Sequence, residues 1–318
     1  MTSIASADSG YRALTEGCGL LDRSERGKLA LTGAEAKPFL QGQVSNDVER
    51  LAAGEGCYAA FLTQKGKMLG DLRVLDTGEE LLLDTERVSL QALFNMIRRF
   101  SIGYDVHLHK RTLERGLISL AGPEADRVAG LELPETEHSH RAAKVEDFGV
   151  RAIRTEFGID LLCDSADIEA LIEALERRGA VTASHEADDC LRIERGRPRY
   201  GVDLDDTVIP QEAGLNERAV SFTKGCYVGQ ETVARLHYRG KPNRQLRGLA
   251  LSAPASPGED LYLGERLVGR LTTVASSPRH GPIALALVRR EAAPEATVRV
   301  GSDGRSARVV ALPFAPVA

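Results

Sequence analysis

The sequence predicts an α+β protein built from two mixed units in tandem, with a small antiparallel β-barrel at the C-terminal end. Two observations indicate the tandem units: apolar residues recur at helical spacing between strand-like segments, and the same succession occurs twice. A third observation is that the helical period disappears from about residue 241. A chain of 318 residues is also too long for one ordinary core. We therefore expect domains at 1–115, 116–240 and 241–318.

The first domain is expected to mix strands and helices. A helix with one apolar face is indicated by Leu90, Leu93, Phe94 and Ile97. Residues 104–108 alternate between apolar and polar types, as a half-buried strand does. Thr32 and Glu35 have the spacing of a capping box and predict a helix start, although Pro38 places the true start later.

The second domain repeats this style. Residues 150–154 and 159–163 are expected to pair as strands. Ser165 is a candidate cap for the helix that follows, and Gly179 suits its end. The apolar face of this helix is formed by Ile168, Leu171, Ile172 and Leu175. Two similar units in tandem are consistent with an internal duplication.

The third domain is predicted to be all β. Short apolar segments are separated by clusters of Gly, Pro and Ser, which favours a small barrel or sandwich. The segments are 246–251, 266–272, 283–288 and 297–300. Pro242-Asn243 is the expected boundary.

Composition and charge argue against several classes of protein. With 42% hydrophobic and 27% charged residues, the chain resembles a soluble globular protein, and its net charge of −5 gives no general attraction to nucleic acid. Residues 1–8 lack the features of a signal peptide, and no apolar run is long enough to span a membrane. The five cysteines are scattered without a Cys-x-x-Cys pair, so we expect reduced thiols in the cytoplasm. No metal site is expected, because His107 and His109 lack a third ligand.

The most informative segment is Lys224-Gly-Cys-Tyr-Val-Gly-Gln-Glu231. Two glycines bracket Cys226, and the residues from Val228 to Arg235 look like the start of a helix. A helix dipole and the Lys224 ammonium would both favour a thiolate at Cys226. The alternative is a buried structural cysteine in a glycine turn.

This segment, continued by Thr-Val-Ala-Arg235, resembles the diagnostic motif of the YgfZ family of folate-binding proteins, relatives of the glycine cleavage T-protein. Two further stretches resemble family motifs in the expected order: Phe39-Leu-Gln-Gly-Gln43 with Asp47, and Leu191-Arg-Ile-Glu-Arg-Gly-Arg-Pro198 leading to Ile209-Pro210-Gln211. The resemblance implies two ferredoxin-like α+β units of the T-protein/YgfZ type, a C-terminal β-barrel, and tetrahydrofolate or a derivative as cofactor.

Two acidic residues gain roles from the resemblance. Glu156, in Thr155-Glu-Phe-Gly-Ile-Asp160, is similar to a T-protein glutamate that accepts the adjacent N–H groups of a pterin; the alternative is a surface glutamate at a strand turn. Asp71 matches one member of a T-protein aspartate pair linked to chemistry at folate N10. Gly70 stands in the other position, which turns the resemblance away from the transferase.

The remaining candidates surround the cysteine. Arg235 and Arg239 are four residues apart, so a helix places both on one face, where they could hold the glutamyl tail of folate or a phosphate-bearing partner such as tRNA. The alternative is a solvated basic face. We expect Lys224 and Tyr227 to contribute to the cofactor site, although a tyrosine here is more often a packing residue.

The resulting hypothesis is a tetrahydrofolate-binding accessory protein that supports iron–sulfur enzyme maturation or repair and tRNA modification. Its partners would be folate, iron–sulfur enzymes or their assembly machinery, and tRNA at a local basic patch, with no membrane. The candidate catalytic residues are Cys226 and Asp71. The alternative is a folate-dependent aminomethyltransferase that uses Asp71 as its acid–base group. A third class is a structural adaptor that has lost folate binding.

Overall fold

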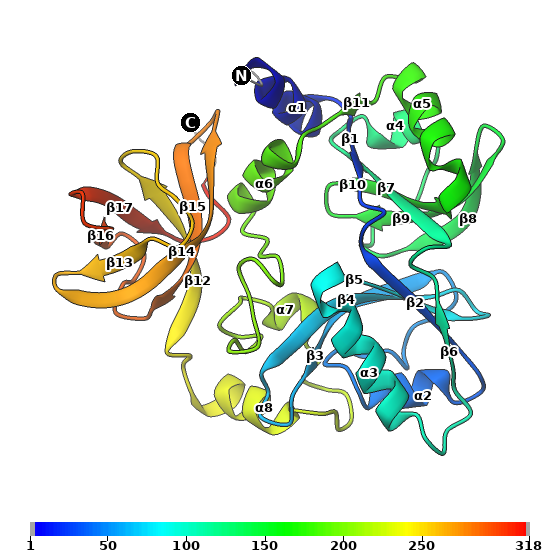
Figure 1. Ribbon diagram of the computed structural model, residues 1–318. Helices are drawn as coiled ribbons and strands as arrows, with labels where there is room; N and C mark the ends of the chain where they lie inside the picture. Colours follow the sequence, from blue (N-terminus) through cyan, green and yellow to red (C-terminus); the bar gives the residue numbers. More distant parts are fainter. Residues whose placement is uncertain (1–3, 316–318) are drawn as a thin grey trace.

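The computed structural model describes residues 4–315 and contains three lobes (Figure 1). Two lobes are sheets covered by helices, and the third is a closed barrel, so the predicted α+β class with a C-terminal antiparallel barrel is confirmed. Residues 1–3, which the signal-peptide expectation includes, lie outside the described range. Within that range, no helix has both the length and the apolar character that crossing a membrane requires.

The first sheet is antiparallel and has the strand order β3-β4-β5-β2-β6. Its strands are β2 (Gly27–Thr32), β3 (Glu55–Leu62), β4 (Met68–Asp76), β5 (Leu81–Thr85) and β6 (His107–Lys110). Helices α2 (Ala36–Gln41) and α3 (Leu90–Phe100) accompany it, and the turn η1 (Arg87–Ser89) precedes α3. Leu93 and Ile97 of α3 are fully buried, while Leu90 and Phe94 pack at the edge of the core, as the helical spacing predicts.

Two local predictions in this lobe are wrong. The capping box does not form: Thr32 Oγ1 instead lies 2.8 Å from His109 Nε2, and Glu35 accepts from the amide of Asp105 at 2.7 Å. The strand expected at 104–108 begins only at His107, because residues 101–104 form a turn.

The second sheet has the order β11-β1-β7-β10-β9-β8. Its strands are β1 (Gly19–Asp22), β7 (Arg115–Ala121), β8 (His140–Val145), β9 (Phe148–Thr155), β10 (Gly158–Asp164) and β11 (Val181–Thr182). Helices α4 (Ala125–Ala129) and α5 (Ile168–Arg177) belong to it, with the turn η2 (Ser165–Asp167) before α5. Strands β9 and β10 pair as predicted, but Ser165 does not cap the helix, because η2 moves the start of α5 to Ile168.

The chain crosses between the lobes at its beginning. Helix α1 (Ile4–Glu16) packs on α6 (His185–Glu194), and β1 then pairs with β7 in the second sheet before the chain enters the first. Residues 19–22 therefore lie in the second sheet, although they precede the whole of the first. The predicted domain ranges 1–115 and 116–240 divide the chain in sequence order. Strand β1 falls in the first range but belongs to the second sheet.

After the second sheet, the chain runs back past the first. Helix α6 contacts both α1 and the barrel strand β14. The following segment, with α7 (Asn216–Ala219) and α8 (Gln230–Arg239), packs on β3 and β4 in a shared apolar cluster. This connecting segment holds all three lobes together (Figure 1).

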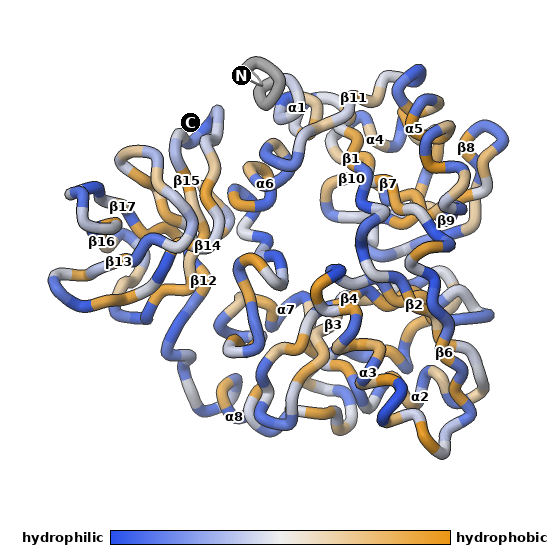
Figure 2. Tube along the Cα trace, in the orientation of Figure 1, coloured by the Kyte–Doolittle hydropathy of each residue, from blue (hydrophilic) through white to orange (hydrophobic). Residues whose placement is uncertain are grey.

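The barrel closes through the order β12-β15-β14-β13-β16-β17, with β12 hydrogen-bonded to β17. Its strands are β12 (Arg244–Leu251), β13 (Asp260–Leu263), β14 (Arg266–Ser277), β15 (Gly281–Arg289), β16 (Thr297–Val300) and β17 (Arg305–Val310). Hydrophobic residues follow the strands and hydrophilic residues mark the hairpin tips, as Figure 2 shows. The four predicted segments all lie on barrel strands.

Candidate functional site

A cavity of about 230 Å³ lies where the two sheets and α6 meet. Its wall includes Tyr58 and Arg73 from the first sheet, Ser119 and Asp160 from the second, Glu156 from the β9–β10 turn and Asp188 from α6. A second chamber of about 420 Å³ adjoins it, and Glu156 lines both. We call the first chamber the central cavity and the second the outer chamber.

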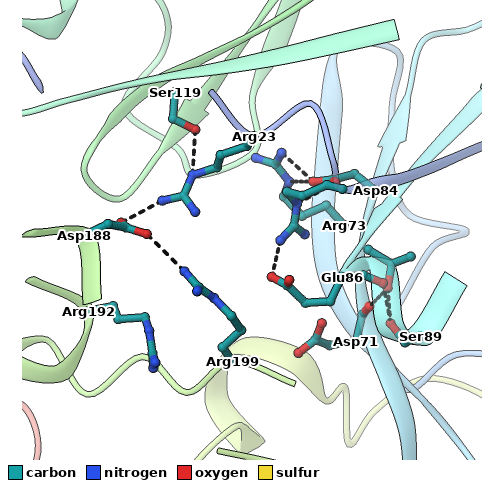
Figure 3. A network of polar contacts seen from close by, with 12 residues as sticks. Arg23, Asp71, Arg73, Asp84, Glu86, Ser89, Ser119, Asp188, Arg192 and Arg199 are labelled. Carbon is teal, nitrogen blue, oxygen red and sulfur yellow. Dashed lines mark hydrogen bonds and ion pairs between the residues drawn. The ribbon is translucent and has the colours of Figure 1, made fainter. Parts of the chain in front are cut away.

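Ion pairs between the lobes hold the wall of the central cavity in place (Figure 3). Arg73 binds Asp84 within its own sheet and Asp160 of the second sheet, the latter at 2.6 Å. Burial opposes the ionisation of Asp84, but the guanidiniums of Arg26 and Arg73 outweigh it and keep the pKa of this carboxyl well below its usual range. Asp84 therefore stays charged and both arginines stay fixed.

A second bridge joins α6 to the sheets. Asp188 accepts from Arg23 at 2.7 Å and from Arg199 at 3.0 Å, and Arg23 also donates to Ser119 at 3.1 Å (Figure 3). Charge-assisted hydrogen bonds of this kind are directional, so they orient the groups at the cavity as well as stabilising the lobes.

The buried Asp71 and the partly buried Tyr58 form a hydrogen-bonded pair at one side of the central cavity. Asp71 is only 5% exposed, and its Oδ2 accepts the Tyr58 hydroxyl at 2.8 Å. Burial raises the pKa of Asp71 to about 6, against the opposing effect of the Tyr58 hydrogen bond. Burial and the Asp71 carboxylate raise the pKa of Tyr58 well above its usual value. Tyr58 lines the cavity and Asp71 does not, so Asp71 reaches the cavity through the tyrosine hydroxyl.

Gly70 leaves no space for a second carboxylate beside Asp71. A Cβ at this position would lie 2.5 Å from the Cβ of Ser89 and 2.6 Å from the ring of Phe61. Because Phe61 is fully buried, a larger residue would have to displace the core. The packing around Gly70 therefore leaves Asp71 without a second carboxylate at the preceding position.

Glu156 faces the cavity and is bound by arginine. Its carboxylate accepts from Arg197 at 2.6 Å and lies 3.9 Å from Arg218, which donates to Glu137 at 2.6 Å. The turn between β9 and β10 places this carboxylate where the two chambers join. A bound heterocycle with adjacent N–H groups would find an acceptor at this point.

Lys224 and Tyr227 support the fold at a distance from the cavity. The Lys224 ammonium donates to the carbonyl oxygens of Gln41, Val44 and Asn46 at 2.6, 2.7 and 2.8 Å, and burial lowers its pKa to about 8. Tyr227 is buried in the apolar cluster on β3 and β4. Within residues 4–315, neither side chain lines the central cavity.

Cys226 is exposed, whereas Cys18, Cys57, Cys163 and Cys190 are buried. The helix predicted from Val228 onward is present as α8, which begins two residues later at Gln230, with Gly229 (φ 85°) as the N-cap and Glu231 in the first turn. Lys224 is directed at backbone carbonyls and not at the thiol. The alternative of a buried structural cysteine is also excluded by the exposure.

Arg235 and Arg239 lie on α8 and are exposed, as a solvated face would be. Next to them His237 stacks on Phe222 at 3.7 Å, and Tyr238 is 67% exposed. In the part of the chain that the structure describes, these arginines line neither chamber. An anion bound by them would therefore lie outside the central cavity.

Sequence reasoning missed several residues of the wall, namely Tyr58, Arg73, His138 and Arg218, whereas Arg197 lies within the 191–198 motif but received no role there. The sequence carries a signal only for Tyr58 and Arg73. In the β3–β4 hairpin Tyr58 pairs with Arg73 and Ala60 with Asp71, so Tyr58, Asp71 and Arg73 share one face. Recognising this shared face requires the register of the hairpin, which the sequence pattern does not determine.

Comparisons with known proteins agree with this architecture. Residues 3–224 match the GCVT N-terminal domain, and residues 244–315 match the glycine cleavage T-protein C-terminal barrel domain. The chain is 30% identical to an aminomethyltransferase of Rubrobacter xylanophilus over 96% of its length and 85% of that protein, and 31% identical to one of Exiguobacterium sibiricum over 96% and 88%. A putative chloroplastic transferase of Arabidopsis thaliana is 28% identical over 95% of this chain and 72% of that protein.

The fold is also that of a solved structure. The glycine cleavage system aminomethyltransferase T from Bartonella henselae superimposes with a TM-score of 0.86 at 24% identity, over 96% of this chain and 89% of that one. The two sheets, the connecting segment and the barrel thus form the aminomethyltransferase-like fold. The chain belongs to the GCVT family, in which this N-terminal domain is followed by the T-protein barrel.

Proposed function

We propose that the protein binds tetrahydrofolate, or a derivative of it, in the central cavity and transfers a one-carbon unit there, as an aminomethyltransferase does. One observation carries the proposal: Glu156 and the Tyr58–Asp71 pair reach the same cavity from two different lobes. The relatives named aminomethyltransferases support the reaction type. We therefore prefer the aminomethyltransferase function to a folate-binding accessory role alone.

The residues of both chambers fit a folate. The Glu156 carboxylate can accept two adjacent N–H groups of a pterin once Arg197 moves aside. Arg195 and Arg279 line the outer chamber and have no ion-pair partner among the described residues, so they can receive the carboxylates of a glutamyl tail. The pterin would therefore lie in the central cavity and the tail in the outer chamber.

When bound, tetrahydrofolate supplies the nitrogen atoms that carry the one-carbon unit. The Tyr58 hydroxyl donates a hydrogen bond to Asp71, which leaves the lone pairs of the hydroxyl oxygen free to accept an N–H in the cavity. Asp71 is mostly ionised at neutral pH, since its pKa is about 6, and can hold a proton delivered through Tyr58. The surrounding ion pairs keep this pair in position without moving during the reaction.

Tetrahydrofolate at saturating concentration is expected to raise the thermal midpoint of the protein by several degrees, because a ligand of the native state stabilises it. Glu156→Gln should weaken the affinity about 10- to 100-fold, since it removes charge-assisted hydrogen bonds. Glu124→Gln, which alters an exposed glutamate paired with Arg127, is the matched control and should bind normally. The absence of any shift with the unaltered protein would refute folate binding.

The exposed Cys226 favours a second function, the folate-binding accessory role of the YgfZ type in iron–sulfur enzyme maturation or repair and tRNA modification. Arg235 and Arg239 on the same segment would then meet the partner outside the cavity. The free cysteines support a reducing, cytoplasmic location.

On this second function, Cys226→Ala should leave folate binding intact but abolish support of an iron–sulfur tRNA-modifying enzyme in cells lacking the native protein. Cys190→Ala, at a buried thiol, is the control for loss of a cysteine as such. Full complementation by Cys226→Ala would exclude a role for the thiol.

A further inference from the structure

His138 is a buried imidazole in the wall of the central cavity that the proposed reaction does not use. It is 6% exposed, and Nδ1 is sealed from solvent without a hydrogen-bond partner. Nε2 lies 3.8 Å from Glu137, beyond hydrogen-bond distance, and that carboxylate is already bound by Arg218. Among the described residues, Nδ1 therefore has no partner, and the nearest acidic oxygen to Nε2 is too distant for a hydrogen bond.

The backbone at His138 is held in a conformation that costs free energy. Its φ of 71° lies in the left-handed region, which side chains other than glycine rarely adopt. The His138 amide donates to Arg154 of β9, and the next amide but one, of His140, donates to Gly54 before β3. Contacts to both sheets therefore impose the conformation, a situation that is common at ligand-binding positions.

The first sheet also makes room for this side chain. A Cβ on Gly56 of β3 would lie 3.0 Å from the His138 Cβ and 2.7 Å from the carbonyl oxygen of Val74. Glycine at this position lets the loop approach the sheet closely, so that His138 enters the cavity between the lobes.

The charges around the ring fix its protonation state. Burial, with the guanidiniums of Arg73 and Arg218, lowers the pKa of His138 to about 3. The imidazole is therefore neutral at physiological pH and offers one donor and one acceptor. Such a group suits an uncharged planar heterocycle that carries both N–H and carbonyl groups, which is the chemistry of a reduced pterin.

We propose that His138 forms a hydrogen bond with the ring system of the bound folate and fixes the position of that ring between Glu156 and Tyr58. This inference rests on the proposed function. It gives the imidazole a hydrogen-bond partner that the protein does not supply, and it accounts for the left-handed backbone, because the loop held in this way brings a neutral donor and acceptor to the cavity wall.

The test compares tetrahydrofolate affinity and thermal stability, both measured on the full chain. His138→Gly removes the imidazole and relieves the left-handed backbone, so it should lower the affinity at least about tenfold. His138→Asn, a residue that tolerates positive φ and keeps a donor and an acceptor, should recover much of that loss. Glu146→Gly, at an exposed residue with φ of 52° in the β8–β9 turn, relieves backbone strain away from the cavity and should leave affinity unchanged.

The outcomes separate the two proposals. Failure of the unaltered protein to bind tetrahydrofolate overturns the proposed function together with this inference. Normal binding by both the unaltered protein and His138→Gly overturns the inference alone. If His138→Gly folds poorly, the affinity of His138→Asn relative to His138→Phe decides, because phenylalanine fills the space without a polar atom. Equal affinity of these two variants contradicts the proposal.

Discussion

Asp71→Asn is expected to lower the rate of one-carbon transfer by about two to four orders of magnitude, the range for loss of a general acid–base group. The amide can still accept the Tyr58 hydrogen bond, so the geometry and folate affinity should be retained, but it cannot take up a proton. The assay is aminomethyl transfer to tetrahydrofolate from a loaded carrier protein. Tyr58→Phe should lose a similar factor, because Asp71 reaches the cavity through that hydroxyl.

The pH dependence gives this prediction a second readout. The reaction needs ionised Asp71, so the rate of the unaltered protein should rise as pH increases through about 6. The rate of the Asp71→Asn variant should not show this rise with pH. If Asp71→Asn keeps both the rate and the rise with pH, another group takes up the proton.

The same substitution should stabilise the protein at neutral pH. Because the folded-state pKa of Asp71 is raised to about 6 from its ordinary value of 3.8, its contribution to stability is fully present below the unfolded pKa and is lost as pH rises through 6. The neutral amide avoids that loss, which amounts to at most about 3 kcal/mol at pH 7. A urea titration at pH 4 and pH 8 measures it, and a variant that is less stable at pH 8 would contradict the burial argument.

Arg73→Met should destabilise the fold by about 3–5 kcal/mol, the usual result of removing one partner from a buried ion pair. Arg73 is the bridge between Asp84 of the first sheet and Asp160 of the second, and both carboxylates are almost fully buried. Ser119 still donates to Asp160 at 2.6 Å in the variant, but a hydroxyl does not neutralise the charge.

Arg115→Met is the matched control, because it breaks an exposed arginine–aspartate pair with Asp164. Exposed pairs contribute little, so this variant should lose about 1 kcal/mol or less. The free energy of unfolding from urea titrations distinguishes the two. Equal losses would mean that the bridge at Arg73 does not stabilise the junction of the lobes.

The fold could be predicted well where local patterns decide it. The barrel strands, the apolar face of α3 and the β9–β10 pair all follow from residue periodicity and turn residues. The crossing of β1 into the second sheet could not be foreseen, because four residues at Gly19–Asp22 carry no signal for the partner strand β7 almost a hundred residues later. Strand exchange of this kind depends on tertiary packing.

The site was predictable in part. Asp71 and Glu156 stand out through their resemblance to T-protein segments; Glu156 lines the central cavity, and Asp71 is hydrogen-bonded to Tyr58, which lines it. Arg73 and His138 could not be identified, and Arg197 was found only as part of a motif, since their roles arise from contacts between segments that are distant in sequence. The most conspicuous motif, around Cys226, lies elsewhere, because Lys224 and Tyr227 anchor it to the first lobe.

The central claim is that the cavity between the two sheets is the folate site. A crystal structure of the protein with a stable reduced folate tests it most directly. The pterin ring is expected in the central cavity, with its N–H groups on the Glu156 carboxylate and the Tyr58 hydroxyl within hydrogen-bond distance. Cys226 is expected to make no contact with the ligand. A folate bound beside Cys226, ahead of α8, would contradict this placement. So would a complex in which Arg197 remains bound to Glu156 and the cavity holds no ligand.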